Sequence, residues 1–270
     1  MTIRRLVALA VLASVWTHIP AATGREAAGV DFVYVEPRTP GFRALYDTMR
    51  SKRVLERASE VIGRIRLPAK LTLRLTECDG QINAWYSPED RSVTLCYEYL
   101  HDVVHRAPER ASPAGITRHA ALVGPVVQVL FHETGHAIFD LLKIPVLGRE
   151  EDAADQVAAY VILLLDPAQA REVIEGSAYI LASYAKEEKP EKDAFADMHG
   201  LSAQRFYNLV CLAYGSDETA FGFVVDNGYL PKDRAESCWE EYDQVAYAVE
   251  KLIAPHLTPK AQLRPHRRLR

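Results

Sequence analysis

Residues 129–140 read VLFHETGHAIFD, in which His132 and His136 are four residues apart and Glu133 directly follows the first histidine. On an α-helix, positions four residues apart lie on one face, so both imidazoles can reach one metal ion. The same spacing also arises by chance between two histidines that merely share a helix. A metal site therefore needs a third ligand from elsewhere in the chain.

The next helical segment, REEDAADQVAAYVILLLD, supplies carboxylates after the short turn LLKIPVLG. We expect Glu151 to be the third ligand, with Asp155 one turn later accepting the free N–H of a ligating histidine. Glu150 and Asp152 are alternative ligands, although only Glu151 has a carboxylate four positions on. Acidic residues also favour a helix start without any metal. Two imidazoles and one carboxylate predict one tetrahedral Zn²⁺ per chain with an open position, although cobalt or manganese also fits.

Composition indicates one domain. The chain has 270 residues, of which 49% are hydrophobic and 25% charged, enough for a full core. We predict a single domain over residues 24–253 and a disordered basic tail over residues 254–270. The positive charge of this tail would also allow contact with an anionic membrane. The net charge of -4 and the lack of phosphate-binding glycine loops argue against nucleic acid as a partner.

The first residues have the pattern of a secretory signal peptide, which we place at residues 1–23. Arg4 and Arg5 precede a short apolar run, and small residues follow near Ala22. That run, like the one at 157–165, is shorter than the roughly 20 residues that cross a membrane. We therefore expect no transmembrane span and a secreted or periplasmic location.

Export makes the cysteines an even set in an oxidising compartment, so two disulfides are expected. Of the three possible connectivities we favour Cys78–Cys96 and Cys211–Cys238, because each joins segments that already read as neighbours. A cysteine-rich zinc knuckle is excluded, since the chain has no CxxC pair.

The periodicity predicts an α+β fold. Apolar and polar residues alternate over 69–99, which predicts a small antiparallel sheet. Gly124-Pro125 is expected to restart or kink the helix that carries HETGH. Helical patterns occupy 41–66, 98–105, 116–142, 150–165, 171–184, 201–214 and the remainder to 252. The C-terminal part is therefore mainly helical.

HETGH followed by Glu151-x-x-x-Asp155 resembles the gluzincin metallopeptidases. Asn83-Ala84-Trp85-Tyr86 resembles the N-A-F-Y strand of the neprilysin branch, and Asp197-Met-His199 with Arg205 resembles its D-x-H-x5-R segment. The resemblance implies a zincin-like fold in which an edge strand packs on the active-site helix. It also implies that the Asn and Ala hold the substrate chain, that the His stabilises the oxyanion and that the Arg contacts a substrate carbonyl.

The chain departs from neprilysin in size, because it is much shorter and its Glu follows HExxH much sooner. EEDAADQVAAYVILLLDP also looks like the E-x-x-A-N/D-x-F-A helix of the small ImmA/IrrE-type peptidases. A compact gluzincin is therefore the better comparison, and overall the chain resembles a bacterial family described only as metallopeptidases.

These residues predict a peptidase or endopeptidase acting on peptide or protein substrates. Glu133 would take a proton from a zinc-bound water and return it to the leaving amine. His199, oriented by Asp197, would donate to the oxyanion, with Tyr207 as an alternative donor. The edge strand at Asn83 would pair with an extended substrate.

Two rival functions remain open. A zinc-stabilised binding protein without turnover would close the site with His199 or Asp197 as a fourth protein ligand. A cell-wall peptide amidase would use the same mechanism on another substrate. A second pair with the same spacing, His101 and His105, lacks the Glu base and is expected to be a surface pair.

Overall fold

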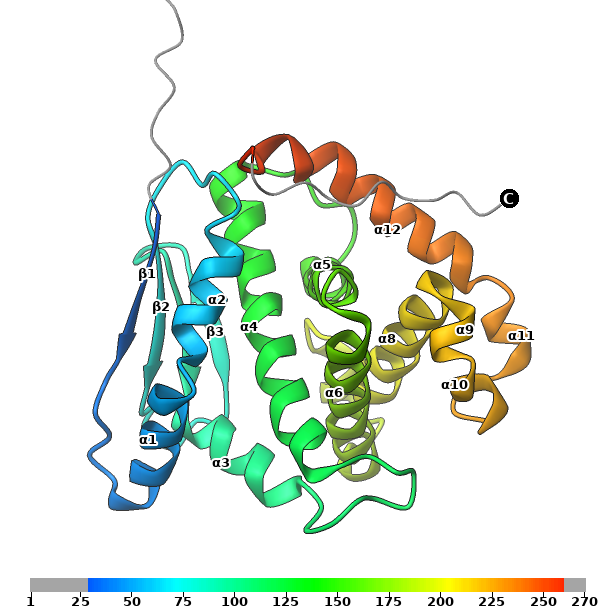
Figure 1. Ribbon diagram of the computed structural model, residues 1–270, viewed down its shortest axis with the longest axis horizontal. Coiled ribbons are helices and arrows are strands. Elements are labelled where there is room, and N and C mark those ends of the chain that lie inside the picture. The colour runs from blue at the N-terminus through cyan, green and yellow to red at the C-terminus, as the bar shows by residue number, and fades with distance from the viewer. Residues whose placement is uncertain (1–28, 260–270) are drawn as a thin grey trace, which may run out of the picture.

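The computed structural model describes residues 29–259, and the α+β class is confirmed. A four-stranded sheet lies at one side of the molecule and the helical part at the other (Figure 1). The strands are β1 (Val30–Tyr34), β2 (Leu71–Thr76), β3 (Ala84–Ser87) and β4 (Ser92–Cys96). They are arranged in the order β1-β2-β4-β3, so β3 is an edge strand.

The sheet is mixed, so the prediction of an antiparallel sheet is correct only for β3 and β4. The pairs β1–β2 and β2–β4 are parallel. After β2 the chain skips one position in the sheet and forms β3 at the edge. A tight turn then leads back to β4, which lies between β2 and β3. Apolar alternation predicts which face of a strand is buried, but it carries no information about strand order or direction.

The helices agree with the predicted helical ranges, with several short additions. They are η1 (Pro40–Phe42), α1 (Arg43–Ser51), α2 (Val54–Ile62), α3 (Tyr97–Arg106), α4 (Arg118–Leu142), α5 (Glu150–Leu163), α6 (Pro167–Glu187), α7 (Lys192–Ala196), α8 (Ser202–Ser216), α9 (Glu218–Phe221), α10 (Phe223–Asp226), α11 (Lys232–Ala235), α12 (Cys238–Leu252) and η2 (Ala254–His256). Helices α1 and α2 form the crossover that the parallel pair β1–β2 requires.

Helix α4 lies between the sheet and the other long helices, and its central place explains its continuity (Figure 1). Thr117 caps its start by accepting from the Ala120 N–H. The helix continues through Pro125, so the predicted restart there is wrong. A proline removes one helical hydrogen bond, and burial of α4 against β3, α5 and α6 offsets that loss. Gly176 lets α6 approach closely, because a Cβ there would overlap the Ala120 carbonyl oxygen.

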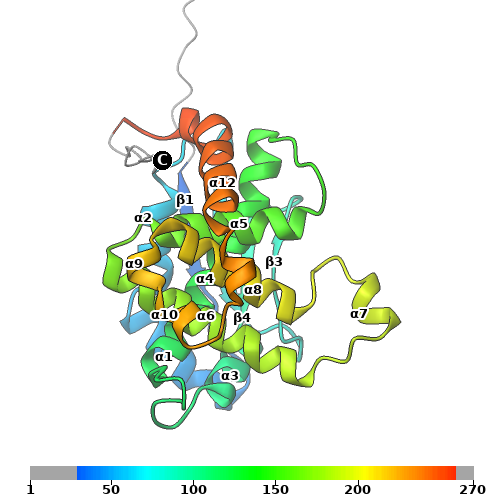
Figure 2. The same ribbon diagram turned by 90° about the vertical axis from the view of Figure 1, so that its right-hand side faces the viewer.

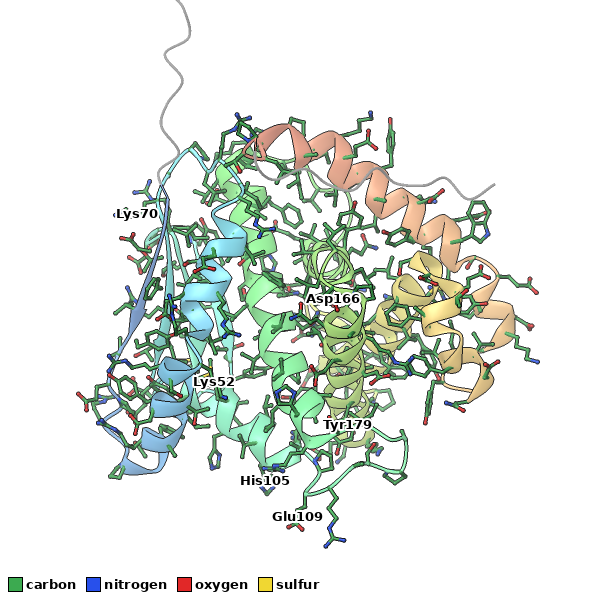
Figure 3. The ribbon with its side chains drawn as sticks, viewed as in Figure 1. Lys52, Lys70, His105, Glu109, Asp166 and Tyr179 are labelled. Carbon is green, nitrogen blue, oxygen red and sulfur yellow. A yellow bond between two sulfur atoms is a disulfide. The ribbon has the colours of Figure 1, made fainter. Side chains whose placement is uncertain are left out.

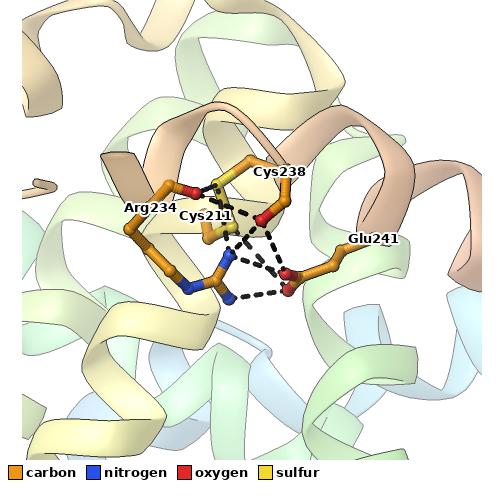
Figure 4. Close-up of a disulfide and its surroundings, with 5 residues drawn as sticks. Cys211, Arg234, Cys238 and Glu241 are labelled. Carbon is orange, nitrogen blue, oxygen red and sulfur yellow. Dashed lines mark hydrogen bonds and ion pairs between the residues drawn. A yellow bond between two sulfur atoms is a disulfide. The ribbon is translucent and has the colours of Figure 1, made fainter. Parts of the chain in front are cut away.

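Both predicted disulfides are present in the structure. Cys78 follows β2 and bonds to Cys96 at the end of β4. Cys211 in α8 bonds to Cys238 at the start of α12, beside an ion pair in which Arg234 Nη1 is 2.6 Å from Glu241 Oε1 (Figure 4). Disulfides of this kind indicate an oxidising, extracytoplasmic compartment. Within residues 29–259, every helix is too short or too polar to cross a membrane.

The predictions for the N-terminal signal peptide and for the C-terminal tail have different outcomes. The signal peptide at residues 1–23 lies outside the described residues, as does the tail from residue 260. The predicted start of the tail at residue 254 is wrong, because η2 is followed by a segment that pairs with the loop after α2. The Arg66 N–H donates to the His256 carbonyl at 2.7 Å, and the Thr258 N–H donates to the Arg64 carbonyl at 2.7 Å.

Candidate metal centre

Helices α4 and α5 pack side by side and carry the candidate ligands. After α4, Lys143 adopts a left-handed conformation with a φ of 54°, and the turn to α5 ends at Gly148 with a φ of 94°. The two helices approach closely at Gly135, within HETGH, where a Cβ would lie 3.2 Å from Ala154 Cα. This close crossing brings the start of α5 beside both histidines.

Three ligand atoms converge at this crossing. The Nε2 atoms of His132 and His136 lie 3.0 Å and 3.2 Å from Glu151 Oε2 and 3.3 Å from each other. Ligand atoms about 2.0–2.1 Å from a tetrahedral zinc ion are separated by about 3.3 Å. The donor types and their spacing therefore fit Zn²⁺, with no need for the chain to rearrange.

The neighbouring acids have other partners. His132 Nδ1 lies 2.8 Å from Asp155 Oδ1, as predicted for an orienting carboxylate. Glu150 Oε1 lies 2.8 Å from the Nδ1 atom of His136, on the nitrogen that faces away from the ligand group. Asp152 accepts from Arg149 at 3.0 Å instead. This geometry favours Glu151 over its two neighbours as the third ligand.

Asp155 joins the site to two further residues. Arg205 donates from Nε to Asp155 Oδ2 at 2.7 Å and from Nη2 to Oδ1 at 2.8 Å. Gln128 Nε2 donates to the same Oδ1 at 3.2 Å. Gln128 was not among the predicted site residues, although its place four residues before His132 puts it on the same helical face. Two of the nitrogens of Arg205 are thus engaged by Asp155 rather than free for a substrate.

A cleft of about 290 Å³ opens beside the ligand group. Its lining includes Asn83 and Ala84 at the start of β3 together with Glu133, His199 and Arg205. Glu133 is buried, with 7% of its surface exposed. A contact that was not predicted from the sequence fixes β3 against α4: the Tyr86 hydroxyl donates to Asp140 Oδ2 at 2.8 Å. The cleft therefore unites the predicted base, the edge strand and the predicted oxyanion donor.

His199 reaches the ligand group from the segment after α7, which projects from the helical part (Figure 2). Its Nε2 lies 2.9 Å from Glu151 Oε2, and its Nδ1 lies 3.2 Å from Asp197 Oδ1. The ligand atoms of His132, His136 and Glu151 all lie within 4.8 Å of one another, and neither His199 nor Asp197 belongs to this group. Tyr207, the alternative donor, is 42% exposed and is not among the residues that line this cleft.

The DUF4344 family, described as "Putative metallopeptidase", matches residues 34–253, which include every candidate site residue named above. The chain belongs to the DUF4344 family. No curated protein and no solved structure matches this sequence.

The charges in this DUF4344 protein suit a cation. Burial alone would raise the pKa of the Glu151 carboxyl, but its three histidine neighbours lower it well below its usual range. Burial opposes charge on His132, yet Asp155 and Glu151 raise its pKa to about 9. Without a metal, protons on His132 and His136 thus balance the carboxylates, and a divalent ion would supply the same positive charge. Burial raises the pKa of Glu133, as a general base requires.

Other candidate ligand groups in the DUF4344 protein have structural roles. Among residues 29–259, the second cluster with metal-ligand spacing is Cys78, Cys96 and Glu98. Its cysteines form a disulfide, and Glu98 accepts from the backbone N–H groups of Cys78 and Gly80. His101 and His105 are both exposed on α3, and Figure 3 shows His105 at the lower edge of the view. The latter pair belongs to neither cluster.

Proposed function

We propose that this chain is an exported zinc-dependent peptidase, periplasmic or secreted, that hydrolyses peptide bonds in extended polypeptides. The observation that carries the proposal is the convergence of His132, His136 and Glu151 beside a buried Glu133 and an open sheet edge. Residues 24–253 would form the peptidase domain, in accord with the continuous core of the described residues. Membership of a metallopeptidase family supports the same class of reaction.

Zinc held by these three ligands would lower the pKa of a water molecule and polarise the scissile carbonyl. Glu133 is the base of the proposal: it takes the water proton and later gives a proton to the leaving amine. Its burial favours this shuttle, because a carboxyl group with a raised pKa binds and releases a proton closer to neutral pH. The positive charge of a bound metal would favour its charged form and so keep it from staying protonated, as His132 and His136 do in the metal-free protein.

The start of β3 would hold the substrate. Ala84 begins the edge strand and Asn83 directly precedes it, and both line the cleft together with Glu133. A polypeptide that adds to this edge gains main-chain hydrogen bonds whatever its side chains, so an extended segment is the expected substrate. The hydrogen bond between Tyr86 and Asp140 holds the strand at a fixed distance from α4.

His199 would donate from Nε2 to the developing oxyanion, because that nitrogen points to the ligand group while Nδ1 faces Asp197. Losing one such donor typically raises the barrier by about 2.7–4 kcal/mol. Arg205 is a positioning residue in this proposal: its bidentate contact holds Asp155, which in turn orients His132. Contact of Arg205 with a substrate carbonyl stays a prediction.

The test is cleavage of a mixed-sequence peptide pool by the oxidised, zinc-loaded protein and by Glu133→Gln at equal zinc occupancy. The expected result is cleavage by the wild type alone. His132→Ala and Glu151→Ala should lose zinc as well as activity, which separates ligands from base. Normal turnover by Glu133→Gln would contradict the mechanism, and zinc binding without cleavage by the wild type would contradict the peptidase.

A further inference from the structure

A second cavity, of about 370 Å³, lies between α2, α4, α5 and the C-terminal segment α12–η2. Its volume is within the range of about 300–1,000 Å³ that small-molecule sites occupy. Apolar side chains dominate the lining, among them Phe131 and Ile138 of α4, Val161 of α5 and Val249 of α12. Thr134 also lines it, but its hydroxyl already donates to the Leu130 carbonyl at 2.6 Å. The walls therefore suit a hydrocarbon.

This cavity is separate from the metal centre. Successive helical residues are rotated by about 100°, so Phe131, Thr134 and Ile138 project from the side of α4 opposite to His132 and His136. No residue lines both this cavity and the cleft beside the metal centre. An occupant here would touch α4 and α5 without reaching the metal ligands.

The segment after η2 closes one wall of the cavity. Leu257 pairs with Ile65 across an isolated bridge, and both side chains line the cavity. The Thr258 N–H donates to the Arg64 carbonyl at 2.7 Å, which fastens this segment to the loop after α2. A few main-chain hydrogen bonds at the surface hold this wall, so it can open at modest cost.

Arg64 gives the cavity a single charge. It is the one ionisable residue with full charge at neutral pH among the lining residues, and it is exposed. Within residues 29–259, its guanidinium has no hydrogen-bond or ion-pair partner, unlike Arg66 nearby, which donates to the Pro255 carbonyl at 2.8 Å. Arg64 thus adds to the apolar lining one guanidinium that has no partner among residues 29–259, and this combination is complementary to a chain with one anionic end.

We propose that this cavity binds a long-chain fatty acid, with the hydrocarbon between α4, α5 and α12 and the carboxylate at Arg64. The guanidinium fork matches a carboxylate in shape and charge. The occupant would join the two helices that carry the candidate metal ligands and so stabilise their packing. This inference is independent of the proposed peptidase activity, because it uses none of the cleft residues.

The test is calorimetric titration of the purified protein with laurate below its micelle concentration. Dodecanol, which has the same chain without the charge, and butyrate, which has the charge without the chain, are the matched probes. Saturable binding of laurate, weaker binding of dodecanol and no binding of butyrate are expected. Butyrate binding as tight as laurate binding would place the carboxylate elsewhere, for instance at the metal centre, and would overturn the proposal.

Two variants locate the binding. Arg64→Gln should weaken laurate binding by about tenfold and leave dodecanol binding unchanged, whereas Arg57→Gln, on the exposed face of α2, should change neither. Leu165→Trp, at a half-buried lining position, should fill the cavity and abolish both. Absence of saturable laurate binding, or laurate binding that survives both Arg64→Gln and Leu165→Trp, would refute the proposed site.

Discussion

Replacement of Asp155 by asparagine tests whether this residue holds the candidate metal site in shape. The carboxylate accepts every contact that it makes, with Oδ1 2.8 Å from His132 Nδ1 and Oδ2 2.7 Å from Arg205 Nε. An amide of nearly the same size has one acceptor and one donor. In either orientation its NH₂ group must face a donor, so either His132 loses its acceptor or Arg205 loses one of its two contacts.

The expected loss is large enough to measure. Removing the partner of a metal-bound histidine typically lowers metal affinity by 10–100-fold, which is about 1.4–2.7 kcal/mol. The variant should also be less stable without metal, because the Arg205 side chain is only 23% exposed and loses its anionic partner. Breaking a buried ion pair costs about 3–5 kcal/mol, and this partly exposed pair belongs at the lower end.

Zinc affinity would be measured by competition with a chromophoric chelator, and stability by urea unfolding in excess chelator. Asp152→Asn is the matched control, since that carboxylate is on the same helix but pairs with Arg149 at the surface. It should leave both quantities nearly unchanged. If Asp155→Asn binds zinc as tightly as the wild type and is equally stable in chelator, then the Asp155 carboxylate holds neither His132 nor Arg205 in place and the proposed role fails.

Three more predictions follow from the packing and the charges. Gly176→Ala should lower the free energy of unfolding by about 1–3 kcal/mol in urea titrations despite better helix propensity, because its methyl group overlaps the Ala120 carbonyl oxygen. Tyr86→Phe removes the hydrogen bond to Asp140 and should cost about 1 kcal/mol and slow peptide cleavage, whereas unchanged cleavage would mean that the strand position does not matter. In chelator, the raised pKa of His132 stabilises the folded protein fully at a pH below about 6.5, the pKa in the unfolded chain, and this contribution is lost as the pH rises to about 9. In zinc-loaded protein the melting temperature should instead rise with pH, since protons compete with zinc for the ligands. Thermal melts across this pH range, with and without chelator, measure both trends.

The long helices and the histidine pair could be predicted from the sequence because both depend on local spacing. Apolar residues recur with helical period over residues 116–142, and the observed α4 covers Arg118–Leu142. Both disulfides could be predicted because each joins segments that read as neighbours in the sequence, with separations of 18 and 27 residues. The predicted restart at Pro125 is wrong, because burial in the interior outweighs the local preference of proline, and the alternative of a kink there stays a prediction.

The strand order and the partners of Arg205 could not be predicted from local spacing. Pairing of β2 with β4 joins strands that β3 separates in the sequence, and alternation is blind to that choice. The resemblance implies contact of Arg205 with a substrate carbonyl, which stays a prediction, but it does not imply that the Nε and Nη2 atoms bind Asp155, 50 residues away. Long-range contacts of this kind depend on how α8 packs against α5.

The choice among three consecutive acids shows where sequence reasoning ends and packing decides. Glu150, Glu151 and Asp152 are rotated by about 100° from one another around α5, so only one of them can point at a given partner. Which one does so depends on the rotation of α5 against α4, and the close approach at Gly135 sets that rotation. Replacing Gly135 by a larger residue should therefore disturb the ligand group, although position 135 contributes no ligand atom. The added side chain would displace α5 and so move Glu151 away from both histidines at once.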